Sequence, residues 1–185
     1  PIDTEPEILD STAQKWIAWR QTDFLQVAEA LHRHIWNEPL DEWKLNFVSF
    51  GSQCDHVGKG FWSASFSFFK EMKTVSGISQ IERQIDIYPG RKFINVWEFS
   101  YEPSLLGSSW NSVEKSEIKI SADEALLIAE QSGGTEKRMT VKNACEVSVM
   151  LSPNSVNYHG WQVMYSPSIY SISIDPITGE SVESH

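Results

Sequence analysis

The sequence lacks the features that most quickly assign a chain to a functional class. No apolar run approaches the roughly 20 residues that a membrane-spanning helix needs. Basic residues number 15 against 25 acidic ones, and the net charge of -10 argues against binding to nucleic acid or to anionic membranes. Walker, GxGxxG, GxSxG and HExxH motifs are absent. We therefore expect neither direct membrane insertion nor a nucleic-acid partner, and the sequence offers no catalytic motif.

Cysteine is scarce, with only Cys54 and Cys145 in the chain. Neither belongs to a CxxC pair or has a histidine at metal-ligand spacing. We expect two separate, partly buried thiols, because unpaired cysteine is commonly buried. The alternative is a bridge between the two halves of the chain, which an oxidising compartment would permit.

The histidines do not follow a metal-binding pattern. His32 and His34 lie two residues apart in a helical stretch, so they point in different directions and we expect both to be solvated. The Cys-Asp-His run at 54–56 lies in a glycine-flanked loop, where adjacent side chains rarely form a nucleophile and its base. Adding His159 produces no standard zinc spacing. The sequence thus predicts no catalytic residue, no metal and no cofactor.

The chain opens with a segment that has no hydrophobic periodicity. Residues 1–10 are acidic and contain two prolines, which is typical of a flexible leader. Because the chain starts at Pro1 instead of Met, we expect that a preceding segment, such as a signal peptide or a lipid anchor, has been removed.

The first half then reads as a helix followed by strands. A helix is predicted from residue 10 or 11 to about Trp36, with Thr22-Asp23 as an interruption or a second start. Alternating apolar residues predict strands around 43–48 and 62–68, and a hairpin is predicted over 85–99. The helical stripe consists of Phe24, Val27, Ala28, Leu31 and Ile35.

The second half repeats this order after a serine- and glycine-rich linker at 104–115. Ser121 and Glu124 form a capping-box pattern at the start of a helix, which Gly133-Gly134 is predicted to end. Strands are predicted around 145–151, 160–165 and 169–174. A tight turn follows, in which Asp175 is expected to cap the backbone.

Three pieces of this half, in order, resemble the PepSY family: a capped helix, a Trp-x-Val strand, and a final strand with its turn. They are Ser121-Ala122-Asp123-Glu124-Ala125, Trp161-Gln162-Val163 and Ile174-Asp175-Pro176-Ile177-Thr178-Gly179-Glu180. The resemblance covers about a third of the chain, and the first half resembles a diverged copy. It implies a small α+β unit of secreted or envelope-associated bacterial proteins that binds or restrains peptidases, or acts in sensing or assembly. It implies no catalytic residues. The chain departs from the family pattern in longer segments at 133–144 and 152–159.

We therefore predict an α+β fold with two related helix-on-antiparallel-sheet units, residues 11–103 and 116–185. Joining the two sheets into one continuous sheet is one way to protect their edges. The aromatic clusters have two interpretations, either core packing or an exposed groove or strand edge that takes a partner. Under the second interpretation, the candidate binding residues are Phe61, Trp62, Phe66, Trp161 and Tyr165.

The expected function is that of a non-catalytic binding or regulatory module of the bacterial cell envelope. It would lie outside the cytoplasm, whether secreted, periplasmic or surface-anchored. It would recognise a protein or peptide, such as a peptidase or an envelope protein. The first alternative is a structural or assembly component that self-associates. The second is a small-ligand carrier or an enzyme with a pocket between helix and sheet.

Overall fold

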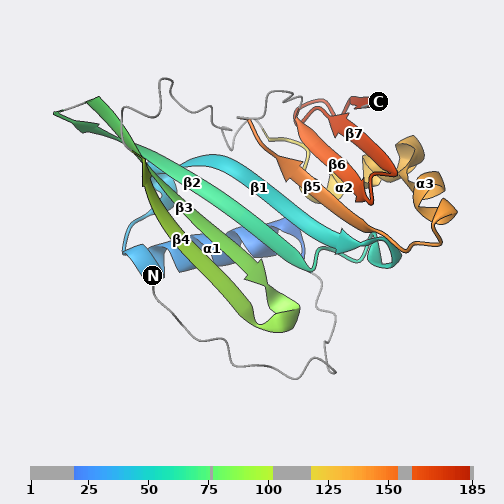
Figure 1. Ribbon diagram of the computed structural model, residues 1–185, viewed down its shortest axis with the longest axis horizontal. Helices are drawn as coiled ribbons and strands as arrows, with labels where there is room; N and C mark the ends of the chain where they lie inside the picture. Colours follow the sequence, from blue (N-terminus) through green and yellow to red (C-terminus); the bar gives the residue numbers. More distant parts are fainter. Residues whose placement is uncertain (1–18, 76, 102–117, 154–159, 184–185) are drawn as a thin grey trace.

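A computed structural model describes residues 19–75, 77–101, 118–153 and 160–183 of the chain. The predicted leader at 1–10 and linker at 104–115 lie outside these ranges. The predicted α+β class is confirmed: helices lie against a single antiparallel sheet (Figure 1). Within the described residues the sheet has eight strands, in the order β4-β3-β2-β1-β5-β6-β7-β8. Among the described residues, no helix combines the length and the apolar character needed to cross a membrane.

The first half consists of one helix and a four-stranded meander. Helix α1 spans Gln21–Trp36 and is followed by β1 (Lys44–Gln53), β2 (Ser63–Thr74), β3 (Gly77–Tyr88) and β4 (Phe93–Tyr101). Short 3₁₀ turns lie at η2 (Leu40–Glu42), η3 (Cys54–His56) and η4 (Pro89–Arg91). Of the predicted helix, the part with a second start near Thr22-Asp23 is confirmed, because Trp19 pairs in extended form with Phe61 and α1 begins at Gln21. Residues 10–18 lie outside the described ranges.

The second half again places helical structure before a meander of four strands. Helix α2 (Ala122–Ala129) leads into η7 (Glu130–Gly134), which is kinked at Gly133, and the short helix α3 (Thr135–Thr140) follows. The strands are β5 (Glu146–Leu151), β6 (Trp161–Ser166), β7 (Tyr170–Ile174) and β8 (Ser181–Glu183). The prediction that the helix ends at Gly133-Gly134 is confirmed at Gly133, whose φ of 120° lies outside the helical region. A second short helix, which the sequence did not predict, follows directly, because Gly134 is again in the right-handed helical region.

The two halves meet where β1 pairs with β5, from Val48 opposite Leu151 to Gln53 opposite Glu146. Alternation along the strands gives the sheet one face that packs against the helices and one face that points away from them. Figure 1 shows α1 behind β1 to β4 and α2 behind β6. The buried core consists mainly of the helix-facing side chains, among them Phe24, Ala28, Phe50, Phe66, Phe68, Ile85, Ala125, Val149, Trp161, Val163, Tyr165 and Ile172.

Cys54 and Cys145 form a disulfide, with their Cα atoms 5.3 Å apart. The prediction of two separate thiols is therefore wrong, and the alternative of a bridge holds. The reason lies in the β1–β5 pairing, which brings the end of β1 and the start of β5 together so that Cys54 N donates to Cys145 O at 2.9 Å. The bridge links residues 91 positions apart and fastens one half to the other.

Two local predictions are confirmed at the ends of the second half. Ser121 Oγ accepts from Glu124 N at 3.2 Å, and the Glu124 carboxylate accepts from Ser121 N at 2.8 Å. The bond from Ser121 N and a second one from the Ser121 hydroxyl to the same carboxylate lower the pKa of Glu124 below its usual value. In the closing turn, one Asp175 oxygen accepts from the backbone N–H groups of Ile177 and Thr178, each at 2.8 Å.

Replacing Ser121 with alanine should lower the free energy of unfolding by about 1 kcal/mol, because the first turn of α2 loses its side-chain acceptor. Thermal or urea unfolding of the full chain measures this loss. Ser132→Ala is the control, since it changes an exposed serine of the same helical segment and should stay within about 0.5 kcal/mol of wild type. Equal stability of Ser121→Ala and wild type would contradict the capping role.

Candidate functional site

Four of the five predicted binding residues lie in the core. Phe61, Phe66, Trp161 and Tyr165 each expose 2% of their surface or less. The rings of Phe61 and Phe66 pack around Phe50, with centroids 5.1 and 5.8 Å from its ring. In this fold these residues have no surface for a partner, so the core-packing interpretation describes them.

The polar atoms of the two buried second-half residues are also engaged inside the protein. Trp161 Nε1 donates to Ile120 O, and the Tyr165 hydroxyl donates to Glu130, both at 2.7 Å. Burial and the neighbouring Glu130 raise the pKa of Tyr165 above its usual value. These bonds attach η7 and the segment just before α2 to strand β6.

Trp62 is the predicted residue that keeps part of its surface exposed. Its ring lies 6.3 Å from that of Tyr88, and the Arg91 guanidinium lies 5.6 Å from its centroid. Cation–π and edge-to-face contacts of this kind hold a half-buried aromatic in place. Trp62 is therefore part of a small cluster beside the β3–β4 turn.

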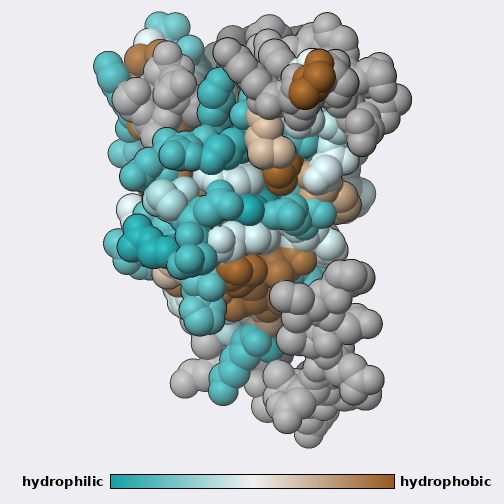
Figure 2. All heavy atoms as spheres, turned by 90° about the vertical axis from the view of Figure 1, so that its left-hand side faces the viewer, coloured by the Kyte–Doolittle hydropathy of each residue, from teal (hydrophilic) through white to brown (hydrophobic). Residues whose placement is uncertain are grey.

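The larger exposed apolar area lies on β4, which the sequence analysis did not single out as a site. Trp97 exposes 39% and Phe99 45% of their surface on the sheet face away from α1, and Ile94 exposes 43% on the other face. We call these three residues and the backbone edge beside them the β4 surface. Figure 2 views the molecule from the side of β4 and the β2–β3 hairpin and shows an apolar area bordered by hydrophilic side chains.

Strand β4 is also an edge of the sheet. In the part of the chain that the structure describes, it pairs with β3 over all nine residues and with no strand on its other side. An edge strand presents backbone N–H and C=O groups that another extended chain can bind. The β4 surface thus combines backbone pairing capacity with large exposed side chains at alternate positions.

A polar network stiffens the sheet beside this surface, on the face away from α1. Glu82 of β3 accepts from the Tyr101 hydroxyl at 2.7 Å and from Asn46 Nδ2 at 3.3 Å, and it also accepts from Ser67. Burial and the Glu82 carboxylate raise the pKa of Tyr101 to about 12. The network joins β1, β2, β3 and β4, so it fixes the position of β4 relative to the sheet.

A second network lies on the helix-facing side of the same strands. The Arg83 guanidinium is stacked between the rings of Trp36 and Trp43, at 4.7 and 4.1 Å from their centroids. Its side chain is only 7% exposed and pairs with Glu98 at 2.7 Å and with Glu38 at 3.3 Å. Arg83 therefore ties β3 and β4 to the C-terminal end of α1.

His32 completes this network, and the prediction that it is solvated is wrong. It is 0% exposed, whereas His34 is exposed as predicted. A guanidinium can only donate, so His32 Nε2 accepts from Arg83 at 3.2 Å and Nδ1 donates to Glu38 O at 3.1 Å. Both ring nitrogens are thus engaged in holding the fold together.

Burial, and then the nearby Arg83 charge, lower the pKa of His32 below 6.5, although the bond to Glu38 O opposes this shift. The unfolded chain then binds a proton more readily than the folded one. We expect stability to fall as the pH decreases below about 6.5, once unfolded His32 takes up its proton. The pKa of Glu38 is lowered by Arg83, so that carboxylate adds its own loss only below about pH 4.5.

Urea unfolding between about pH 5 and 8 measures this dependence in the range where histidine titrates. His32→Gln should flatten the slope in that range, while the exposed-site control His34→Gln should retain it. An unchanged slope in His32→Gln would show that another group is responsible.

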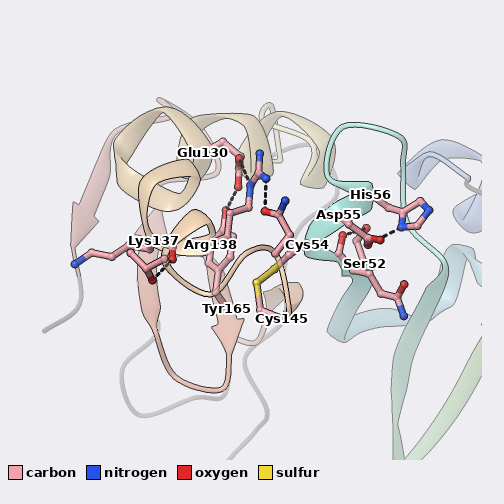
Figure 3. The surroundings of a disulfide bond; sticks show 12 residues. Ser52, Cys54, Asp55, His56, Glu130, Lys137, Arg138, Cys145 and Tyr165 are labelled. Carbon is pink, nitrogen blue, oxygen red and sulfur yellow. Dashed lines mark hydrogen bonds and ion pairs between the residues drawn. A yellow bond between two sulfur atoms is a disulfide. The ribbon is translucent and has the colours of Figure 1, made fainter.

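The disulfide lies near a third group of polar side chains (Figure 3). Glu130 is paired with Arg138 at 2.8 Å, while Asp55 is paired with His56 at 2.7 Å. A shallow, open groove of about 410 Å³ runs beside the bridge and is lined by Asp55, Cys145, Glu146, Pro167 and neighbouring residues. The disulfide consumes both thiols, so Cys54 has no free sulfur for nucleophilic attack.

Within the described residues, no group of three or more His, Cys, Asp or Glu side chains is arranged to hold a metal ion. His159, which the sequence analysis considered beside residues 54–56, lies outside those residues.

Comparison with known proteins found no relative of this chain. No protein-family model, no curated protein and no solved structure matches this chain. The resemblance to PepSY domains therefore stays a prediction. The proposed function depends on the geometry of the chain itself.

Proposed function

We propose that the protein is a non-catalytic binding module that recognises an extended segment of a partner protein at the β4 surface. The observation that carries the proposal is an edge strand of nine residues with Trp97 and Phe99 on one of its faces, 39% and 45% exposed. Exposed aromatics of this size supply most of the binding energy in many interfaces.

Addition of a strand fits this geometry. The backbone edge of β4 supplies hydrogen bonds that do not depend on partner sequence. Trp97 and Phe99 lie two residues apart on one face, so they can contact alternate side chains of a paired segment. The Arg83 and Glu82 networks hold β4 rigidly, which lowers the entropy lost when a partner binds.

Charge indicates the chemistry of the partner. Glu82 and Asp86 of β3 lie on the same sheet face as Trp97 and Phe99, and the whole chain carries a net charge of -10. Opposite charge favours encounter and correct orientation. The partner segment therefore has apolar residues at alternate positions and basic residues near them.

An extracytoplasmic location in the bacterial cell envelope is part of the proposal. The Cys54–Cys145 disulfide supports it, because such bonds persist in oxidising compartments. The PepSY-like pattern in the second half supports it as well and makes a peptidase or an envelope protein a suitable partner.

We also propose that the two halves are diverged copies of one unit. Each half has helical structure followed by a meander of four strands, and the first strands of the two meanders pair at the centre of the sheet. The N-terminal ends of α1 and α2 form hydrogen bonds with each other. Gln21 N donates to Asp123 at 3.0 Å, and Ala122 N donates to the Gln21 side chain at 2.5 Å. A homologous sequence whose two halves align with each other would support the duplication. A homologue with a different order of elements in each half would contradict it.

Self-association is the second candidate function, because an edge strand can also pair with the same strand of another copy. The backbone groups at the edge of β4 could pair with a second copy of the chain as well as with a partner peptide. The acidic side chains beside β4 weigh against it, since two copies would bring like charges together.

The proposal is tested by selecting peptides of about 12 residues from a random display library on the full, oxidised chain. Selected peptides should alternate apolar residues and carry basic ones. The double variant Trp97→Ser/Phe99→Ser should weaken binding of a selected peptide more than tenfold, a loss of about 2 kcal/mol or more. Methylating alternate backbone nitrogens of the peptide should also abolish binding.

The matched control is Leu127→Ser/Ile177→Ser, which removes two side chains of similar exposure, 50% and 46%, elsewhere on the surface. It should leave peptide binding unchanged. Peptides that bind both double variants equally would refute the β4 site. A dimer seen by analytical ultracentrifugation and lost in Trp97→Ser/Phe99→Ser would instead establish the self-associating component.

A further inference from the structure

A cavity of about 110 Å³ lies between α1 and the sheet, near the junction of the two halves. Its lining comes from α1, β1, β2 and β6 and from Ile118 in the segment before α2: Gln21, Leu25, Leu45, Val48, Phe50, Phe66, Phe68, Ile118 and Trp161. Eight of these nine side chains are apolar. The cavity is separate from the β4 surface, because none of its lining residues belongs to β3 or β4.

The inner walls are formed by buried aromatic rings. Phe50, Phe66, Phe68 and Trp161 expose 2% of their surface or less. The Phe50 ring lies edge-on to Phe66 at 5.8 Å and tilted to Trp161 at 6.3 Å. Protein interiors are otherwise close-packed, and a dry apolar cavity of roughly 150 Å³ accepts benzene or xenon. The space here is of the size of a single aromatic ring.

The mouth has a polar group. Gln21, Leu25 and Ile118 are only half-buried, while the other lining residues are buried, so the cavity opens between α1 and residue 118. The Gln21 side-chain oxygen accepts from Ala122 N at 2.5 Å. Its amide nitrogen is then the group that can donate a hydrogen bond at the rim.

We propose that this cavity binds a small monocyclic aromatic compound. The ring lies among Phe50, Phe66 and Trp161, where offset and edge-to-face contacts are favourable. A polar substituent of the ligand points to the mouth and accepts a hydrogen bond from Gln21. The site is independent of the peptide-binding role and would stand if that role were refuted.

The experiment titrates the full, oxidised chain with benzene and with phenol and follows saturation-transfer NMR signals of the ligands together with the methyl signals of Leu25, Leu45 and Val48. Both ligands should bind saturably and shift those methyl signals. Leu25→Phe and Val48→Ile add atoms at the cavity wall, and Leu25→Phe should weaken both ligands at least about tenfold. Val48→Ile adds only one methylene group. It tests whether filling the cavity weakens ligand binding if Leu25→Phe does not fold.

Two further variants separate the parts of the site. Gln21→Met should weaken phenol about fivefold through loss of the rim hydrogen bond and leave benzene nearly unchanged. Leu127→Phe places the same added ring on an exposed helix position and should bind both ligands as wild type does. Absence of saturable benzene binding to wild type would overturn the proposal. So would binding that is unaffected by Val48→Ile and Leu25→Phe, or weakened equally by Leu127→Phe.

Discussion

Removing the disulfide with Cys54→Ala/Cys145→Ala is expected to lower the free energy of unfolding by about 4 kcal/mol. The bridge closes a loop between residues 91 positions apart, so its loss returns much conformational freedom to the unfolded chain. Alanine is the suitable replacement because the cysteines are 1% and 9% exposed, and serine would add a buried hydroxyl.

Urea unfolding should be compared for oxidised wild type, wild type reduced with dithiothreitol, and the double variant. The reduced protein and the variant should unfold at nearly the same urea concentration, well below oxidised wild type. If all three unfold together, the bridge contributes no net stability and the halves are held by the β1–β5 pairing alone.

Replacing Trp161 with alanine is expected to cost about 4 kcal/mol of stability, as for other large-to-small changes in a packed core. The side chain is 1% exposed, borders the apolar cavity and packs near Phe50. Its indole nitrogen also satisfies Ile120 O, which the alanine variant leaves without that donor. Trp161→Phe keeps a ring in place and should cost clearly less.

The matched control is Trp97→Ala, which removes the same side chain from a site that is 39% exposed. It should lower stability far less than Trp161→Ala in urea unfolding, yet weaken peptide binding. Equal losses of stability in the two variants would contradict the assignment of Trp161 to the core and Trp97 to the β4 surface.

The features that the sequence predicts correctly are local ones. The Phe24–Ala28 stripe lies on α1, and the alternation of Ala64, Phe66 and Phe68 lies on β2 with its apolar face buried. The Ser121–Glu124 cap and the Asp175 turn involve residues at most three apart. Bonds of such short span depend little on the rest of the fold, so the sequence suffices to predict them.

The wrong predictions concern residues whose contacts are with residues far away in the sequence. His32 was predicted to be solvated because it cannot share a metal with His34, but it follows Phe24 and Ala28 on the buried face of α1. Arg83, which binds its ring there, lies 51 residues away in the sequence. The cysteines carried no spacing signal, since pairing of β1 with β5 is what aligns them. The aromatic pattern marked Trp161 and Tyr165 as candidates for binding, whereas α2 and η7 cover them.

The β4 surface could not be found from its own residues. The run from Phe93 to Tyr101 alternates like any half-buried strand, and only the strand order places it at the edge of the sheet. The cavity is similar, because its walls come from four secondary-structure elements and the segment before α2.

By itself, the sequence determined that this protein is an α+β chain, with the main elements in their order and the capped helix start and turn of the second half. Hydrophobic periodicity and short-range hydrogen bonds encode these features directly. Tertiary structure alone decided which side chains are buried, which cysteines meet, which strand is left at an edge and where a cavity stays open. Those properties depend on contacts between segments far apart in the chain, and they arise only when the helices and the strands of the sheet have packed together.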